Sequence, residues 1–447
     1  MSTVVKAPPA LPIAVRTVRR VNRRVMPFLF ILYIVAYLDR VNVSYAGLEM
    51  TKELGFSNEV FGFGAGIFFI GYVILEIPGT LLVELWSARK WIARILISWG
   101  LLASLTGLIE NQRHFYWIRF LLGAAEAGFF PGIIVYITHW YRYEDRAKAV
   151  AMFMAAIPLA NIIGSPMSGL LMKIHWLNLS GWRWLLILEG IPAVILGFVT
   201  LYYLTDWPKD AHWMPEDERN WLTSELEREK QTKRQVRPLS VWQALRNRDV
   251  VLLTLIYFFI VTCNYGFGIW LPKIVQMLSG LSTFQVTLVT AIPFLAAFPA
   301  MLLVGWHSDK TGERRWHTAA SMFCVGIFLA LSQWAGSNVV LAIAMFTVAA
   351  MGLYCYLPSF WAMPTTFLSE AAAAACIGLI NSLGNLGGFA GPYVIGYLST
   401  RYGNYVAGVL YLVASAMVAG FLVLLLKGTR KLTHPGDAAA PAGPVPN

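Results

Sequence analysis

Apolar residues run through this sequence in stretches of about 20, separated by shorter polar segments. Stretches of that length cross the hydrocarbon core of a bilayer as α-helices. One polar segment is much longer than the others, from Asp206 to Asp249, and it divides the apolar stretches six and six. The pattern predicts an all-α polytopic membrane protein with 12 transmembrane helices in two six-helix halves, near residues 26–47, 60–85, 92–110, 114–140, 147–173, 184–204, 250–277, 284–306, 317–335, 338–362, 371–400 and 403–427.

The composition agrees with a membrane protein, because 57% of the residues are hydrophobic and only 13% are charged, against about 25% charged in soluble domains. Mean hydropathy is +0.59. A net charge of +11 is also typical of nucleic-acid-binding proteins, so the positions of the basic residues must distinguish a nucleic-acid partner from a membrane. Of the 35 Lys and Arg, about 27 lie in the tails and even-numbered loops and about six in the odd-numbered loops. This distribution follows the positive-inside rule, so we expect cytoplasmic termini, a lipid bilayer around the chain and no nucleic-acid partner.

The same pattern predicts five segments: a cytoplasmic basic tail (1–25), an N-terminal six-helix half (26–205), a cytoplasmic linker (206–249), a C-terminal six-helix half (250–427) and a disordered cytoplasmic tail (428–447). The first apolar stretch does not read as a cleaved signal peptide, because it follows a basic lead and contains two charges near its middle. In the linker, Pro215 followed by three acidic residues predicts a helix start. PLSVWQAL at 238–245 predicts a second short helix.

Enzyme chemistry has no support in the motifs. The four cysteines lie inside or at the ends of the apolar stretches, without spacing for a metal site or a disulfide framework. The chain has no HExxH, no Ser/His/Asp set and no phosphate-binding glycine loop followed by Lys. We therefore expect no enzyme activity, no metal and no cofactor.

A short internal repeat indicates that the two halves are related. ELWSARKW at 84–91 aligns without gaps on DKTGERRW at 309–316, each after the second predicted helix of its half. In each copy an acid at the end of one helix and two cations at the start of the next can form a charge clamp. The alignment pairs Glu84 with Asp309, Arg89 with Arg314 and Lys90 with Arg315.

Charged residues that lie at least five positions from either end of a predicted helix all fall in the first half: Asp39, Arg40, Glu76, Arg119, Glu126 and Glu189. Each costs about 2.5 to 3.5 kcal/mol near the bilayer centre, so each is a candidate functional residue. Asp39 and Arg40 lie about 100° apart around their helix, so one can face a cavity while the other faces a neighbouring helix. Arg119 and Glu126 are two turns apart and project from one face. An arginine suits carboxylate binding and a carboxylic acid can carry a proton, so the set predicts proton-coupled transport of an organic anion.

The sequence resembles the major facilitator superfamily, and within it the anion:cation symporter branch of tartrate, hexuronate, phthalate and hydroxyphenylacetate permeases. The resemblance covers about residues 24–427. It is carried chiefly by YIVAYLDRVNVSYA (33–46), RFLLGAAEAGFFPG (119–132), GWHSDKTGERRWH (305–317) and INSLGNLGGFAGPYVIGYL (380–398). The loop signature residues are Glu84, Arg89, Lys90, Gly305, Asp309, Gly312, Arg314 and Arg315. The first copy departs from the family pattern, with Glu84 in place of Asp and Ser87 in place of Gly.

The resemblance implies 12 helices and symport of a small organic carboxylate, with closest similarity to tartrate-type permeases. It implies proton coupling by Asp39 and Glu126, basic positions at Arg40 and Arg119, and cavity positions at Tyr37, Tyr72 and Asn385. We add three polar or aromatic residues that the seventh, tenth and eleventh helices should turn toward the same cavity: Tyr265, Trp361 and Asn381. It also implies a monomer in a bacterial inner membrane, with the proton as coupling ion.

Other readings of the same residues remain open. Asp39 and Arg40 could form a static salt bridge that fixes helix packing. Glu76 and Glu189 each stand before a proline, and we favour packing or hydrogen bonding to freed backbone groups for both. Sugar acids and aromatic carboxylates fit the same transport mechanism. A degraded match to an exporter motif, ANIIGSPMSG at 160–169, leaves drug/proton antiport as a further alternative.

Overall fold

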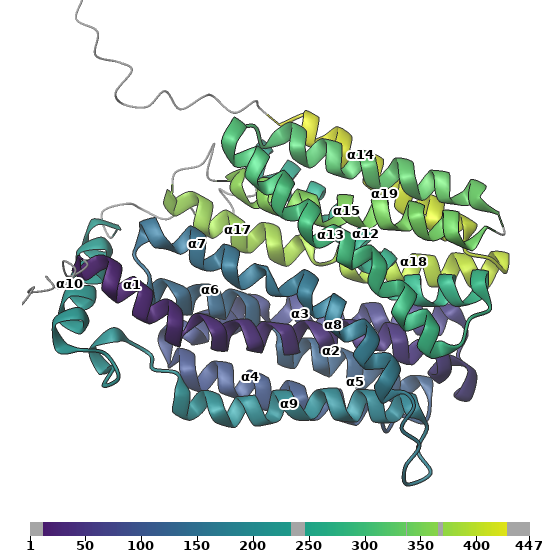
Figure 1. The fold of residues 1–447 in the computed structure, drawn as a ribbon, viewed down its shortest axis with the longest axis horizontal. Coiled ribbons are helices and arrows are strands. Elements are labelled where there is room, and N and C mark those ends of the chain that lie inside the picture. Colours follow the sequence, from purple (N-terminus) through teal and green to yellow (C-terminus); the bar gives the residue numbers. More distant parts are fainter. Residues whose placement is uncertain (1–11, 234–245, 337, 365–369, 427–447) are drawn as a thin grey trace, which may run out of the picture.

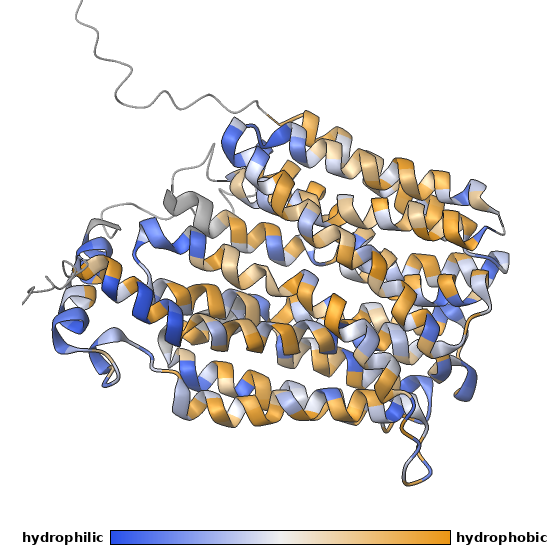
Figure 2. Ribbon diagram, viewed as in Figure 1, coloured by the Kyte–Doolittle hydropathy of each residue, from blue (hydrophilic) through white to orange (hydrophobic). Residues whose placement is uncertain are grey.

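The computed structural model describes residues 12–233, 246–336, 338–364 and 370–426. The predicted helix at 238–245, the first 11 residues of the predicted N-terminal tail and the whole predicted C-terminal tail lie outside these residues. Helices make up almost all of the described chain, which runs as two neighbouring bundles in Figure 1. In Figure 2 apolar residues cover the middle of the helices, while polar residues gather at their two ends.

The first bundle starts with α1 (Ile13–Arg24), a short basic helix that lies beside the linker helix. The helices that follow in this bundle are α2 (Met26–Glu53), α3 (Asn58–Leu85), α4 (Ala88–Thr106), α5 (Gln112–Glu126), α6 (Phe129–Trp140), α7 (Tyr143–Met154), α8 (Ala156–Leu171) and α9 (Gly181–Tyr203).

The second bundle follows the linker, which contains η1 (Pro208–Asp210) and α10 (Glu216–Lys233). Its helices are α12 (Arg248–Ser279), α13 (Thr283–Thr311), α14 (Arg315–Ser332), η2 (Gln333–Ala335), α15 (Val339–Ala362), α17 (Glu370–Gly384), α18 (Gly387–Tyr402) and α19 (Val406–Leu424).

These helices give 12 membrane crossings, as predicted. Ten spans in the described residues are long and apolar enough to cross a bilayer by themselves. The other two are α4, which begins with basic residues, and the pair α17 and α18, which follow one another along a single path. Three predicted stretches are each divided between two helices: α5 and α6, α7 and α8, and α17 and α18.

The break between α5 and α6 has a clear local cause. Ala127 leaves the helical region with ψ 135°, and Gly128 takes a left-handed conformation with φ 83°. Glycine adopts this conformation without a Cβ penalty. Glu126 therefore stands at the last turn of α5, where the chain changes course.

Polar caps mark where helices enter and leave the apolar region. The side chains of several Ser and Asn residues accept a hydrogen bond from a backbone N–H in the first turn, as N-caps do. These caps are Ser57, Ser87, Asn111, Asn247, Ser282 and Asn338. Glycines in the left-handed conformation end α12, α13 and α18.

The two bundles pack through α3 against α18, α8 against α13, and α2 against α12. The α3–α18 crossing depends on glycine, since a Cβ on Gly62 would lie 3.2 Å from the Cα of Gly396. Small residues let helix backbones approach this closely in membranes. A cavity lies beside these crossings, between the bundles.

The linker helix α10 packs against the first bundle at one end of the molecule, which we call the linker end. Arg16 and Arg20 on α1 form ion pairs with Asp217 and Glu218, both at 2.8 Å. Glu229 pairs with Arg146 on α7, also at 2.8 Å. The helix predicted to start after Pro215 is therefore present.

Candidate functional site

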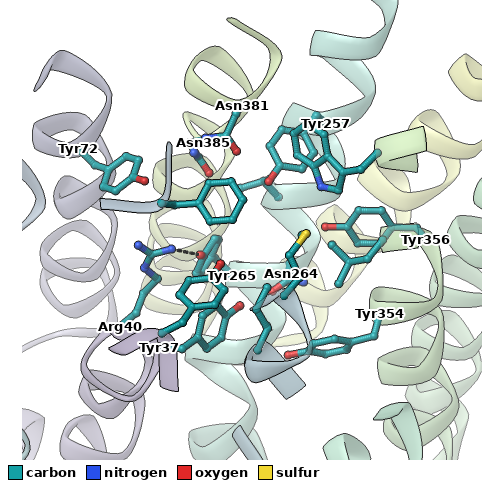
Figure 3. Close-up of a pocket in the computed structure, with 17 residues that line it drawn as sticks. Tyr37, Arg40, Tyr72, Tyr257, Asn264, Tyr265, Tyr354, Tyr356, Asn381 and Asn385 are labelled. Carbon is teal, nitrogen blue, oxygen red and sulfur yellow. Dashed lines mark hydrogen bonds between the residues drawn. The ribbon is translucent and has the colours of Figure 1, made fainter. Parts of the chain in front are cut away.

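A cavity of about 60 Å³ lies between the two bundles, near the middle of the helices. One water needs about 10 to 15 Å³, so the cavity has room for roughly four to six waters, which suits a small polar solute. Seven predicted site residues line it together: Tyr37, Arg40, Tyr72, Tyr265, Trp361, Asn381 and Asn385. Figure 3 shows that most of their polar groups converge on this space from both bundles.

Arg40 on α2 is the charged residue among the described residues that line the cavity. One of its guanidinium nitrogens forms an ion pair with Glu126, and the other donates to the Tyr265 hydroxyl at 3.2 Å. The rings of Phe68 and Tyr72 lie 5.7 and 5.4 Å from the guanidinium carbon. The side chain is thus held by an acid of its own bundle, a phenol of the other bundle and aromatic faces.

Glu126 lies behind Arg40 and does not line the cavity itself. Its side chain is 1% exposed, and Arg40 is the cation that pairs with it. A carboxylate buried this deeply is stable in the ionised form only beside a cation. Removing Arg40 from the pair therefore changes the preferred charge of Glu126.

Arg119 occupies a different place from the one expected for a substrate-binding residue. It is 2% exposed, does not line the cavity, and donates to the Ala65 carbonyl oxygen at 3.4 Å. Its guanidinium lies 5.0 Å from the centre of the Phe68 ring, which also contacts Arg40. Within the described residues no carboxylate lies within 4 Å of it. In this conformation Arg119 acts on the cavity only through its charge and through Phe68.

Asp39 also turns away from the cavity, into the first bundle. Its carboxylate accepts hydrogen bonds from the Trp99 indole N–H at 2.8 Å and from the Asn42 amide at 3.3 Å. The alternative of a static salt bridge between Asp39 and Arg40 is wrong for this structure. The two neighbours point about 100° apart around α2 and take separate partners.

Glu189 and Glu76, whose roles the sequence left open, each accept a hydrogen bond from a side chain. Glu189 accepts from Ser168 on the neighbouring α8 at 3.4 Å. Glu76 accepts from the Asn381 amide at 2.5 Å, and this bond joins α3 of the first bundle to α17 of the second. Because Glu76 stands one turn beyond Tyr72 along α3, this contact joins the two bundles on the linker side of the cavity.

The second-half loop signature folds as the charge clamp that was predicted. Arg314 pairs with Asp309 at 2.5 Å, and Gly312 makes the turn between them with φ 68°. Arg315 donates to the Leu426 carbonyl at 2.8 Å. Gly305 packs where α13 meets Pro358 of α15.

The first-half signature works differently. The Glu84 side chain lies outside the described residues, and Asp206 at the start of the linker caps α4. Its carboxylate accepts from the Ser87 hydroxyl at 2.7 Å and from the Arg89 backbone N–H at 2.8 Å. Lys90 lies over the Trp86 ring, with its amine 5.9 Å from the ring centre. A serine at position 87 therefore gives the linker acid a partner that glycine could not.

Sequence reasoning missed several residues of the cavity wall: Tyr33, Tyr257, Asn264, Tyr354 and Tyr356. On two helices the spacing of these residues along the sequence could have identified them as cavity residues. Tyr33, Tyr37 and Arg40 stand four and three residues apart, as do residues 257, 261 and 264, so each set shares one helix face.

No group of three or more His, Cys, Asp or Glu side chains with metal-binding geometry occurs in the part of the chain that the structure describes.

The Major Facilitator Superfamily profile matches residues 29–392. The chain belongs to this superfamily. It is therefore a membrane transporter rather than an enzyme.

The similar proteins that have names are all described as transporters, but their names point to different solutes. A protein of Agrobacterium vitis named a putative tartrate transporter is 45% identical over 427 residues, which are 95% of this chain and 98% of that protein. A quinolone resistance transporter of Acinetobacter baumannii is 38% identical over 91% of this chain and 93% of its own. The fold is similar to that of a bacterial homologue of the lysosomal transporter Spinster, inward-facing and occupied, with a TM-score of 0.73 at 16% identity, covering 90% of this chain and 96% of that chain.

Proposed function

We propose that the protein takes up a small organic carboxylate together with protons, and that its substrate is a tartrate-like hydroxy acid. The observation that carries the proposal is the pairing of Arg40 with Glu126 at the wall of the cavity. The name and 45% identity of the Agrobacterium vitis relative support the choice of substrate class.

Charge balance explains how substrate and proton become coupled. Arg40 and Glu126 together are neutral, so a substrate carboxylate brings an uncompensated negative charge into a buried site. A proton on Glu126 removes that charge and frees the guanidinium, which can then bind the substrate with two parallel hydrogen bonds. Substrate and proton therefore bind best together, and Glu126 takes the coupling role predicted for it.

The rest of the cavity wall suits a hydroxy acid. Tyrosine hydroxyls both donate and accept, and the amides of Asn264, Asn381 and Asn385 offer further donors and acceptors. These groups can bind hydroxyls along a short carbon chain while Arg40 binds one carboxylate. Asp39, hydrogen-bonded away from the cavity, has in this proposal a later role in proton movement.

Transport proceeds in this proposal by rocking of the two bundles about the central site. Arg40 with Tyr265 and Glu76 with Asn381 are contacts between the bundles that must change during the cycle. We further propose that the chain works as a monomer in a bacterial inner membrane, with both termini and the linker end in the cytoplasm.

The test is uptake by proteoliposomes that contain a pH-sensitive dye. Tartrate, glucarate and an aromatic carboxylate are added one at a time, at a pH where each is fully ionised. Acidification of the lumen with one acid, absent from empty liposomes, is the expected result and identifies substrate and symport together. A folded protein that takes up none of them with protons would overturn the proposal.

Glu126→Gln separates coupling from binding. Glutamine imitates the protonated acid, so we expect exchange of labelled substrate across the membrane to persist while proton-driven accumulation is lost. Glu110→Gln, the same change at an exposed loop position, is the matched control and should accumulate substrate normally. Normal accumulation by Glu126→Gln would remove this residue from the coupling role.

Drug export is the second candidate, because a quinolone resistance transporter is 38% identical. Cells that express an exporter accumulate less drug, whereas a carboxylate importer leaves drug accumulation unchanged. Measuring quinolone accumulation in cells with and without the protein distinguishes the two.

A further inference from the structure

A second and larger cavity opens at the end of the molecule opposite the linker. Its volume is about 530 Å³, within the range of small-molecule sites. It lies where α2, α3 and α12 approach the turn between α18 and α19. Its polar lining consists of Lys52, Asn58, Lys273, Gln276, Asn404 and Tyr405, and none of its described lining residues is acidic. We call this space the outer vestibule.

Lys273 is the central feature of the vestibule. Its amine is partly buried and donates to the Thr51 hydroxyl at 3.1 Å and to the side-chain amide oxygen of Asn58 at 2.8 Å. The rings of Phe61 and Trp270 lie 5.6 and 5.7 Å from it. Within the described residues no carboxylate lies within 4 Å of this amine.

The charge of Lys273 is therefore only partly compensated. An ammonium carries three N–H donors, and the two neutral oxygens use two of them. A buried cation normally has a counter-charge, because desolvation is costly without one. Lys52 adds a second cation to the same cavity, also without a carboxylate within 4 Å among the described residues. Two cations and neutral donors around an open space form a site that is complementary to an anion.

We propose that the outer vestibule is a second anion-binding site, which takes a small carboxylate anion before it reaches Arg40. The idea that this anion is the transported one rests on the proposed function, whereas anion binding by the vestibule does not. Positive charge that lines a cleft raises the local concentration of anions and speeds their association. The same amine bonds α12 to α2 and α3, so the vestibule lies where the two bundles meet at this end of the molecule.

Binding is tested in the full-length protein with Arg40→Gln, which removes the cation of the central cavity. The measurement is the thermal unfolding midpoint in tartrate, compared with sodium chloride at equal ionic strength. We expect tartrate to raise the midpoint in this background. The rise should disappear on adding Lys273→Gln and return with Lys273→Arg, which restores the charge.

Lys173→Gln is the matched control. Lys173 follows α8 at the same end of the molecule and lies over the Phe284 ring, outside the vestibule. This variant should keep the tartrate effect. A tartrate effect that survives Lys273→Gln would overturn the proposed site. An effect of inorganic phosphate that tartrate cannot reproduce would overturn its assignment to carboxylates.

Transport kinetics test the role of the site in capture. With Arg40 intact, Lys273→Gln should lower kcat/KM about tenfold at low salt while leaving kcat unchanged. The loss should shrink at high salt, since the Debye length falls from about 30 Å at 0.01 M to about 3 Å at 1 M. A loss of kcat that does not depend on salt would contradict capture. If no acid is transported but the tartrate effect on unfolding depends on Lys273, the proposed function fails and the anion site stands.

Discussion

Replacing Arg40 by lysine gives the sharpest test of the central site. The positive charge remains, but the planar fork of donors is lost. In the structure two different guanidinium nitrogens serve two partners, Glu126 and Tyr265. A lysine amine on a shorter side chain cannot reproduce that geometry, nor can it bind a carboxylate with two parallel hydrogen bonds.

The loss is about one charge-assisted hydrogen bond, worth about 1.5 to 3 kcal/mol. That range corresponds to substrate binding weakened about 10- to 150-fold. Equilibrium binding of labelled substrate to purified protein measures it directly. Arg94→Lys is the control, because Arg94 on α4 lies over the Trp91 ring and does not line the cavity, and this change should leave the Kd unaltered.

Folding must be checked alongside binding, because the Arg40 side chain also bonds across the bundles. Unchanged elution on gel filtration and a thermal midpoint near that of the native protein show that the variant is intact. A change of about twofold in Kd corresponds to much less free energy than one charge-assisted hydrogen bond. If folded Arg40→Lys binds substrate with a Kd within about twofold of the native value, carboxylate binding by the guanidinium is refuted.

Three further changes test other parts of the structure. Trp99→Phe removes the indole N–H that donates to the buried Asp39 carboxylate, so we expect the free energy of unfolding to fall by about 1 to 3 kcal/mol and the thermal midpoint to drop. Trp117→Phe, on the lipid-facing surface, is the control and should change the midpoint little. Asn381→Ala breaks the bond to Glu76 between the bundles. Maleimide labelling of Cys376, the buried cysteine of α17, should then become about 2- to 10-fold faster. An unchanged labelling rate would rule out a closing role for this contact. Arg119→Lys should lower the thermal midpoint through lost stacking but change the substrate Kd less than about threefold, and a larger change in Kd would place this residue at the substrate.

Much of the site was accessible from the sequence because intramembrane charges are costly and therefore few. Arg40 and Glu126 stood out for that reason, and they form the ion pair at the cavity. Aromatic and amide residues were harder to select, because membrane helices contain many of them. The sequence analysis selected Tyr265 and Asn381, which line the cavity, but it did not select Tyr354 and Tyr356, which line it as well.

The loop signatures show where local pattern reaches its limit. The second copy contains its own acid and arginine five residues apart, and the clamp forms between them. In the first copy the partner of Ser87 and of the Arg89 backbone is Asp206, more than a hundred residues away. No spacing rule connects those positions, because they meet only when α4 and α9 pack side by side.

The sequence by itself determined the number of membrane crossings, their division into two halves, the class of transporter and the residues able to carry charge in the membrane. The class of transporter follows from the resemblance of the motifs to those of the superfamily. The other properties follow from the length of apolar stretches and from the cost of charge in lipid, which act locally along the chain. Only the tertiary structure decided that Arg40 faces the cavity while Asp39 faces Trp99, that Arg119 lies behind Phe68, and that Lys273 reaches the first bundle. Adjacent positions on a helix differ by about 100°, and which direction meets a cavity or a neighbour depends on how the two bundles pack.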